Sequence, residues 1–303
     1  MRIIGISDIH GNLVNIPECD ILCICGDIVG LNDQRSMDAS KHWFENRFAN
    51  WINKLPCEKV FAVPGNHDFY IESCYTNSNK LNEQLLKDIE LKTNNKLKFL
   101  IDEYVIYKDT KFYGTPWVNP IGRKPFWAFD PNKYLLDNLL EEKFSKIPKD
   151  TDILLSHDNP YMNETLEIYS KVAKYHLYGH WHDGIANENK NRYNCSLLND
   201  NYWLKYKPKV IDIISNEEKI KQNIMMTLIQ IVDQLKACGF TCEAGKLEDN
   251  IAFKELEKLV TELSENAELE EDQISWDNVI TGEVIEEDPT VEDNTNTEDI
   301  YND

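Results

Sequence analysis

Five short polar clusters within the first 182 residues most constrain how this chain can fold, because each follows an apolar run rich in β-forming residues. The clusters are Asp8-Ile9-His10, Gly26-Asp27, Gly65-Asn66-His67-Asp68, Ser156-His157-Asp158 and Gly179-His180-Trp181-His182. The chain has seven histidines, and five of them fall inside these clusters. Buried strands whose ends deliver polar side chains into one cleft are typical of an α/β protein with its site along a sheet edge.

The first two thirds of the chain predict mixed strands and helices. The apolar runs at 2–7, 21–25, 60–64, 98–101 and 153–156 predict strands, and residues 104–107 with 110–114 predict an antiparallel hairpin. Residues 38–53 and 79–91 are partly amphipathic and predict helices, and 201–214 predicts a further strand.

The character of the chain changes after residue 215. Asn216 can cap a helix whose apolar residues recur at spacings of three and four and which Gly239 can end. A second helix is expected at 250–266. These two helices are either a hairpin packed on the core or a module for a protein partner or self-association. We therefore divide the chain into a domain at 1–215, a helical extension at 216–268 and an acidic, disordered tail at 269–303.

Charge and cysteine usage narrow the class of protein. Fifteen acidic and no basic residues lie in 264–303, so the remainder carries about −6 of the net −21. This counts weakly against nucleic acid as a partner, since phosphate backbones are bound through Lys and Arg. No run of about 18 apolar residues predicts a membrane span, and the N-terminus does not resemble a signal peptide. We interpret the eight cysteines as free thiols of a cytoplasmic protein.

The residue types in the clusters are those that bind divalent metal ions. Carboxylate and amide oxygens suit hard cations, and imidazole extends the choice to manganese, iron, zinc and nickel. Asp27 has two oxygens and could bridge two ions, which a histidine cannot do. Paired ions of this kind serve mainly to hydrolyse phosphate esters. Any single histidine here is readily explained as a structural residue, but the ordered set is not.

The order Asp-x-His, Gly-Asp, Gly-Asn-His-Asp, His, Gly-His-x-His resembles the calcineurin-like metallophosphoesterase superfamily over about residues 1–214. The stretch Gly114-Thr115-Pro116-Trp117, the stretch Phe126-Trp127-Ala128-Phe129 and the ending 194–213 look like a branch of metallophosphoesterase-domain-containing proteins related to class III cyclic nucleotide phosphodiesterases. The resemblance implies a four-layer α/β/β/α sandwich with two divalent metals, Mn²⁺ or Fe²⁺/Fe³⁺ before Zn²⁺ or Ni²⁺.

The resemblance also implies a role for each cluster residue. One metal would be bound by Asp8, His10, Asp27 and His182, and the other by Asp27, Asn66, His157 and His180. His67 would be the acid or transition-state stabiliser, with Asp68 behind it orienting the imidazole. A hydroxide between the two metals would attack phosphorus.

Two departures from the family pattern bear on the substrate. Residues 28–31 lack the Asp-Arg of Ser/Thr phosphatases, so a phosphoprotein substrate is disfavoured. His157 is followed by Asp158 where the related branch has glycine, and this carboxylate either caps a turn, which we favour, or binds a substrate cation. The aromatic stretch 114–129 either stacks an aryl group or packs a rim. Candidate substrate-binding residues are Asn12, Arg123 and Lys124, although Asn12 is equally suited to a turn.

Three functions compete at this point. We favour a metal-dependent phosphodiesterase or phosphomonoesterase acting on small molecules, including nucleotides. The alternatives are a nuclease of the same superfamily and a non-catalytic interaction protein that retains the fold. The complete set of cluster residues argues against the non-catalytic alternative.

Overall fold

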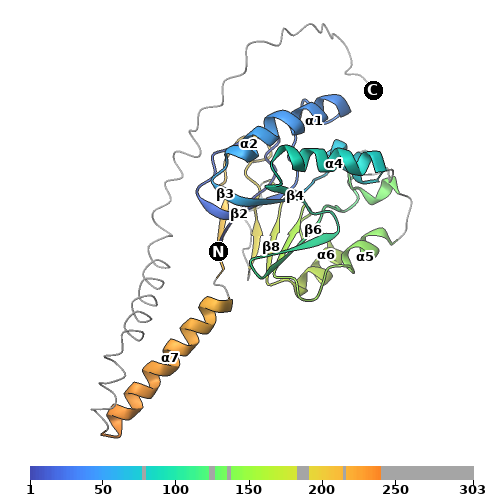
Figure 1. Cartoon of the computed structure of the whole chain (residues 1–303). Helices are drawn as coiled ribbons and strands as arrows, with labels where there is room; N and C mark the ends of the chain where they lie inside the picture. Colours follow the sequence, from blue (N-terminus) through green and yellow to red (C-terminus); the bar gives the residue numbers. More distant parts are fainter. Residues whose placement is uncertain (77–79, 123–126, 135–137, 183–190, 214–215, 240–303) are drawn as a thin grey trace.

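The computed structural model describes residues 1–76, 80–122, 127–134, 138–182, 191–213 and 216–239, and it contains two mixed sheets (Figure 1). The first sheet has the order β10 (Lys209–Asp212), β1 (Arg2–Ile6), β2 (Cys19–Cys25), β3 (Cys57–Val63) and β4 (Leu97–Phe99). The second has the order β5 (Glu103–Tyr107), β6 (Thr110–Thr115), β7 (Ile153–Ser156), β8 (Tyr175–Tyr178) and β9 (Arg192–Asn194). Neighbouring strands are parallel except for the pairs β1–β10 and β5–β6. The expected strands and the hairpin are confirmed.

Helices lie on the outer side of each sheet. Beside the first sheet are α1 (Met37–Trp43), the π-helical segment η1 (Phe44–Phe48), α2 (Ala49–Lys54), α3 (Phe69–Thr76) and α4 (Lys80–Lys92). Between β6 and β9 along the chain come the 3₁₀ turn η2 (Pro131–Lys133), α5 (Leu139–Phe144), α6 (Glu164–Tyr169) and the 3₁₀ turn η3 (Ser170–Val172). Figure 1 shows α1, α2 and α4 on one side of the paired sheets and α5 and α6 on the other. This arrangement confirms the predicted α/β/β/α sandwich.

The central strands are buried on both faces. Along β2, Ile21 and Cys23 join a core cluster with residues of the second sheet, whereas Leu22 and Ile24 join the cluster formed with the helices. All four side chains are fully buried. A strand that is covered on both faces reads as a continuous apolar run rather than an alternating one, as this sequence does. The polar clusters therefore start from rigid strand ends.

The segment predicted as one helix at 38–53 contains a wider turn in its middle. Ser36 caps α1 by accepting a hydrogen bond from the amide of Ala39 at 3.2 Å. The chain then passes through η1, in which Phe44 and Phe48 are both fully buried. Local π-helical turns inside α-helices add a residue to one turn, and here that turn lies between two aromatic core residues.

After β10 the chain enters α7 (Asn216–Ala237), which points away from the two sheets in Figure 1. The helix begins at the predicted cap residue, and Gly239, with a φ of 88°, follows its end. The expected second helix at 250–266 and the acidic tail lie outside the described residues. Within the described ranges, no helix combines the length and the apolar character that a membrane span requires.

Candidate metal centre

The carboxyl ends of five strands bring the polar clusters together. Asp8 and His10 follow β1, Asp27 follows β2, and Asn66 and His67 follow β3. From the second sheet, His157 follows β7, and His180 and His182 follow β8. Parallel strands end at the same edge of a sheet, and residues of the two sheets meet across this edge. Three groups of side chains there place their ligand atoms within 4.8 Å of one another: Asp8 with His10 and His182, His10 with Asp27 and His67, and Asp27 with His157 and His180.

The backbone at several of these positions adopts a conformation that L-residues rarely take. The φ angles are 52° at Asp8, 40° at His10, 52° at Asp27 and 67° at His180. Such positive φ values cost about 1–3 kcal/mol each and persist where the surrounding fold enforces them. These strained positions lie together at one edge of the sheets. The surrounding fold therefore stabilises an unfavourable local backbone conformation that directs these side chains into a common site.

Two glycines allow the close approach that this site requires. A Cβ atom on Gly65 would lie 2.2 Å from Oδ1 of Asp27, and one on Gly179 would lie 1.9 Å from Oγ of Ser7. Both contacts are far shorter than van der Waals distance. Glycine is therefore the residue that these two positions accept, which explains the Gly-Asn-His-Asp and Gly-His-x-His patterns.

Asp27 lies at the centre of the site and faces both sides of it. Its Oδ1 atom is 3.3 Å from Nε2 of His157, and its Oδ2 atom is 3.6 Å from Nε2 of His10. The Nε2 atom of His157 is also 2.8 Å from Oδ1 of Asn66. One carboxylate thus contributes a different oxygen to each of two groups of nitrogen and oxygen ligands.

The histidine rings are held by backbone carbonyls. Nδ1 of His157 lies 2.8 Å from the carbonyl oxygen of Cys25, and Nδ1 of His182 lies 3.2 Å from that of Asn199. Donation through Nδ1 leaves Nε2 facing the site, where that of His182 is 3.2 Å from Oδ1 of Asp8. Such outer hydrogen bonds fix the tautomer and orientation of metal-binding imidazoles.

His10 provides the strictest test of whether a metal fits. Both of its ring nitrogens are buried and have no hydrogen-bond partner in the described part of the chain. Burial lowers the pKa of His10 to about 4, so the ring is neutral at physiological pH. A buried, neutral, unpartnered imidazole beside two carboxylates costs stability unless a cation takes its lone pair. The residues present therefore fit a bound metal.

The charges around Asp27 lead to the same conclusion. Burial opposes the charged form of His157, yet the adjacent Asp27 carboxylate raises the pKa of His157 to about 10. Burial likewise opposes ionisation of Asp27, but His157 and His67 hold its pKa well below the usual range. The buried carboxylate thus requires a neighbouring positive charge, which a divalent cation would supply in place of the imidazolium proton.

The expectation that Asp68 orients the His67 ring is wrong. Both oxygens of Asp68 accept backbone N–H groups, from Ile28 at 3.0 Å and 3.2 Å and from Gly65 and Val29 at 2.7 Å and 3.0 Å. The turn after β3 directs this buried carboxylate toward the β2 loop instead of along the imidazole. Gln34 takes the expected role, because its Oε1 atom contacts Nδ1 of His67.

The predicted substrate-binding residues lie in different places. Asn12 is exposed and donates from Nδ2 to the carbonyl oxygen of Ile9 at 2.8 Å, which is the turn role. Arg123 and Lys124 lie outside the described residues. Asp158 accepts hydrogen bonds from the backbone N–H of Asn119 and from Nδ2 of Asn163, both at 2.8 Å, as expected for a loop-organising carboxylate.

A cavity of about 370 Å³ opens over the site. It is lined by Asp27, Asn66, His67, Ile121, Trp127, His180, Trp181, His182, Asp200 and Tyr202. Of the aromatic stretch 114–129, Trp117 and Phe129 are core residues, whereas Trp127 lines the cavity with its ring 4.7 Å from that of His67. Packing therefore accounts for Trp117 and Phe129, while stacking of an aryl group remains a prediction for Trp127.

Sequence reasoning missed two residues beside the histidines. Gln34 comes from the loop after Gly26-Asp27, and Tyr202 from the loop before β10. The Tyr202 ring packs edge-on against His10 at 4.9 Å and His182 at 5.2 Å, with a φ of 60°. Neither loop has a periodic pattern. A tyrosine between two polar segments offered only a weak signal, and Gln34 offered none.

Comparisons with known proteins show the family to which the chain belongs. The chain is 24% identical over 251 residues to human metallophosphoesterase domain-containing protein 1, which covers 70% of this chain and 71% of the relative. It is also 24% identical over 251 residues to a Caenorhabditis elegans UPF0046 protein, covering 70% of this chain and 60% of the relative. A solved archaeal phosphodiesterase aligns with a TM-score of 0.29 and 15% identity, covering 70% of this chain and 93% of that one. The model of the calcineurin-like phosphoesterase family matches residues 1–184, and the chain belongs to this family of phosphoric ester hydrolases.

Proposed function

We propose that the protein is a dinuclear metal-dependent phosphodiesterase that cleaves small phosphodiesters bearing an aromatic or nucleoside group. The observation that supports this most directly is the position of Asp27, which offers one oxygen to His157 and the other to His10. A carboxylate shared between two groups of ligands suits two cations held close together.

The ligand sets follow from the groups around Asp27. One cation would be held by Asp8, His10, Asp27 and His182, and the other by Asp27, Asn66, His157 and His180. The mixture of imidazole, amide and carboxylate favours Mn²⁺ or Fe²⁺. When bound, such a pair neutralises phosphate oxygens and lowers the pKa of water in the site.

His67 completes the site without belonging to either of these sets. Gln34 contacts Nδ1, and Nε2 lies 3.8 Å from Oδ2 of Asp27 beside the cavity. From this position Nε2 can hydrogen-bond to an oxygen of the phosphate or transfer a proton to the departing oxygen. Trp127 packs against the ring and limits its rotation, so His67 is held ready for that role.

The cavity lining supports a diester of modest size. Its aromatic members, Trp127, Trp181 and Tyr202, provide faces on which a base or aryl group can stack. Among the described lining residues there is no Lys or Arg, and Asp200 adds a carboxylate. A phosphodiester carries one negative charge and a phosphomonoester up to two, so the Asp200 carboxylate repels the monoester more strongly than the diester. A polymer would need the basic groove that such a lining does not offer.

The experiment is a comparison of two chromogenic substrates with the full-length protein loaded with Mn²⁺. We expect kcat/KM for bis-p-nitrophenyl phosphate to exceed that for p-nitrophenyl phosphate by at least about tenfold, equivalent to about 1.4 kcal/mol. Chelation should abolish both activities. Equal or greater activity on the monoester would overturn the diester assignment, and activity that survives exhaustive chelation would overturn the metal mechanism.

Rates measured on a panel of nucleotides then test whether the enzyme prefers a diester that bears a nucleoside group. Cyclic nucleotides should be cleaved faster than bis-p-nitrophenyl phosphate, and Trp127→Ala should raise KM for nucleotides more than it raises KM for the chromogenic diester. Preferred cleavage of single-stranded DNA would instead favour the nuclease alternative.

A further inference from the structure

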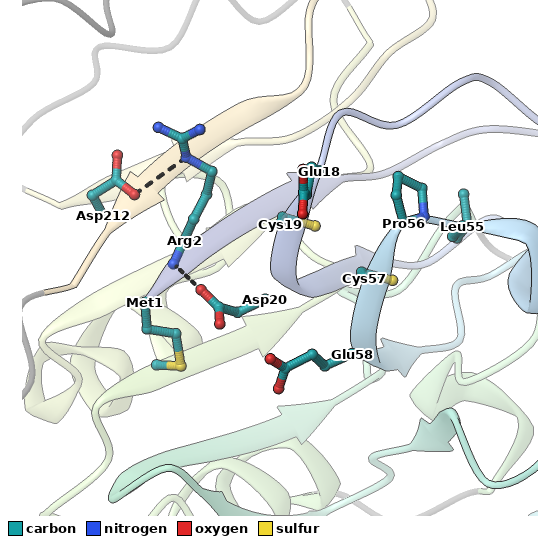
Figure 2. Close-up of a pocket in the computed structure, with 10 residues that line it drawn as sticks. All are labelled: Met1, Arg2, Glu18, Cys19, Asp20, Leu55, Pro56, Cys57, Glu58 and Asp212. Carbon is teal, nitrogen blue, oxygen red and sulfur yellow. Dashed lines mark hydrogen bonds and ion pairs between the residues drawn. The ribbon is translucent and has the colours of Figure 1, made fainter. Parts of the chain in front are cut away.

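A second polar cavity lies at the opposite end of the strands that bear the metal ligands. Its volume is about 670 Å³, and its lining includes Cys19, the first residue of β2, and Cys57, the first residue of β3. Figure 2 shows the two cysteines on adjacent strand starts. The carboxyl ends of the same strands lead to Asp27 and Asn66, so this cavity is separate from the metal centre.

The register of the sheet pairs these two cysteines directly. Cys19 and Cys57 are partners across the parallel strands β2 and β3. Adjacent strands lie about 4.8 Å apart, and a disulfide needs a Cα separation of about 4.4–6.8 Å. Each thiol lies close enough to the other to shift its pKa. The backbone therefore already holds the pair within bonding range.

The two thiols differ in access and in acidity. Cys57 is partly exposed to the cavity, whereas Cys19 is 7% exposed. The adjacent Cys19 thiol, helped by the nearby charge of Lys96, lowers the pKa of Cys57. The same contact, together with burial, raises the pKa of Cys19. Access decides the order of attack: the partly exposed Cys57 meets a small disulfide first, and the buried Cys19 then attacks the resulting mixed disulfide.

We propose that Cys19 and Cys57 form an oxidisable dithiol site, which low-molecular-weight disulfides convert into an intramolecular disulfide. The Cys57 thiolate attacks one sulfur of the small disulfide, breaks its S–S bond and releases one small thiolate, leaving a mixed disulfide on Cys57. Cys19 then loses its proton and attacks Sγ of Cys57, which releases the second small thiol. Two protein thiols are oxidised, one small disulfide is reduced to two thiols, and the two protons pass to those thiols.

The charge around the cavity indicates which disulfide to use as a probe. Glu18, Asp20, Glu58 and Asp212 line it, with Arg2 as the basic residue of the lining. Asp20 accepts the backbone N–H of Arg2 at 2.7 Å, and the Arg2 guanidinium lies 3.4 Å from Asp212, as Figure 2 shows. Because Lys108 forms ion pairs with Asp20 at 2.7 Å and with Glu58 at 2.9 Å, the acidic excess of the lining is small, and it favours a cationic disulfide over an anionic one. Cystamine is therefore the appropriate oxidant.

The chain contains its own control pair. The thiols of Cys25 and Cys195 are also close together, but both are fully buried, and burial raises the pKa of Cys25. Cys238 is an exposed free thiol. If thiol contact alone were sufficient, the buried pair would oxidise as well. If exposure alone decided the outcome, Cys57 would keep a trapped cysteamine as Cys238 does, instead of forming a disulfide with Cys19.

The experiment treats the reduced, folded full-length protein with cystamine, alkylates the remaining thiols in denaturant and maps the cysteines by peptide mass spectrometry. We expect a Cys19–Cys57 linked peptide as the main product, with Cys25 and Cys195 alkylated and Cys238 carrying cysteamine alone. Alkylation of Cys57 to the same extent as Cys25 would overturn the proposal, and so would a linked Cys25–Cys195 peptide formed at an equal rate.

Single substitutions test the order of the two steps. In Cys19→Ser, one cysteamine should remain trapped on Cys57, and in Cys57→Ser, Cys19 should stay reduced. Thermal unfolding of each variant confirms that it is folded, and the mapping of the unsubstituted protein stands whether or not a variant folds. Modification of Cys19 in the absence of Cys57 would contradict the assigned roles.

Discussion

Oε1 of Gln34 contacts Nδ1 of His67 across 33 residues of sequence, and this contact orients the histidine that we propose as the proton donor. A carboxamide oxygen accepts from an N–H group, so the ring carries its proton on Nδ1 when neutral. Nε2 then faces the cavity. The same position of Nε2 would serve a hydrogen bond to phosphate or proton transfer to the leaving oxygen.

His67→Ala should reduce kcat for bis-p-nitrophenyl phosphate by about 100-fold, the usual lower range for loss of a general acid. Metal content should not change, because His67 is outside both proposed ligand sets. Turnover and metal analysis on the same preparation measure the two effects separately, with His42→Ala, an exposed histidine of α1, as the control. Loss of a metal together with activity would make His67 a ligand instead.

Gln34→Ala should lower kcat by about tenfold with little change in KM, as expected when the group that orients a functional histidine is lost. Gln34→Glu keeps the hydrogen-bond acceptor and adds a negative charge, which stabilises imidazolium. This variant should recover most of the activity, and its pH–rate profile should shift to higher pH. If the two variants share one profile, Gln34 does not position His67.

Asp27→Ala should remove both cations, whereas His182→Ala and His180→Ala should each remove one. The reason is the shared carboxylate, whose two oxygens face His157 and His10 separately. Metal analysis of the purified variants, together with calorimetric titration by Mn²⁺, measures the stoichiometry directly. Retention of one tightly bound cation by Asp27→Ala would show that the two sites do not depend on a shared ligand.

The strands and the order of the clusters could be predicted because both depend on short, contiguous stretches of sequence. A buried strand such as β2 is a continuous apolar run, and Gly26-Asp27 follows it directly, so the pattern predicts both the strand and the place where the carboxylate emerges. Convergence of the ends then follows from parallel pairing. Partners such as Gln34 and Tyr202 could not be predicted, because loops without periodicity bring them to the site from far along the chain.

The misassignment of Asp68 has a physical cause. It is adjacent to His67 in sequence, and adjacency suggests that the carboxylate supports the imidazole. The tight turn after β3 separates the two side chains, and the carboxylate instead accepts the backbone N–H groups of Ile28 and Val29 in the loop after β2 and of Gly65 in its own turn. Asp68 therefore pairs with backbone N–H groups instead of His67, because buried N–H groups need hydrogen-bond partners.

Asp68→Asn should therefore destabilise the fold more than it alters chemistry. The amide has one accepting oxygen where the carboxylate has two, so at least one of the amides of Ile28, Val29 and Gly65 would be left unpaired. An unsatisfied buried donor costs about 1–3 kcal/mol of unfolding free energy. Urea unfolding measures this loss against Asp109→Asn, an exposed position where the change should be below about 0.5 kcal/mol. A reduced kcat with unchanged stability would return Asp68 to a catalytic support role.

His176 should make stability depend on pH in a defined window. It is fully buried on β8, its Nε2 lies 2.8 Å from Oγ of Ser156, and its Nδ1 has no partner in the described part of the chain. Burial, followed by the charge of Arg192, lowers the pKa of His176 from 6.5 to about 3. The folded state therefore keeps the ring neutral at pH values where the unfolded state protonates it.

This difference in pKa determines how the stability of the fold changes with pH. Between the unfolded pKa of 6.5 and the folded pKa of about 3, the unfolded chain binds one more proton, so stability falls as the pH is lowered. The contribution of His176 is complete above that window, and it changes by at most about 1.4 kcal/mol per pH unit inside it. His176→Asn removes the titrating group while keeping a hydrogen-bond donor toward Ser156. Urea unfolding between about pH 7.5 and pH 4, with chelator present so that both proteins are metal-free, should give a shallower pH slope for the variant. Identical slopes would mean that His176 is protonated in the folded state as readily as in the unfolded chain.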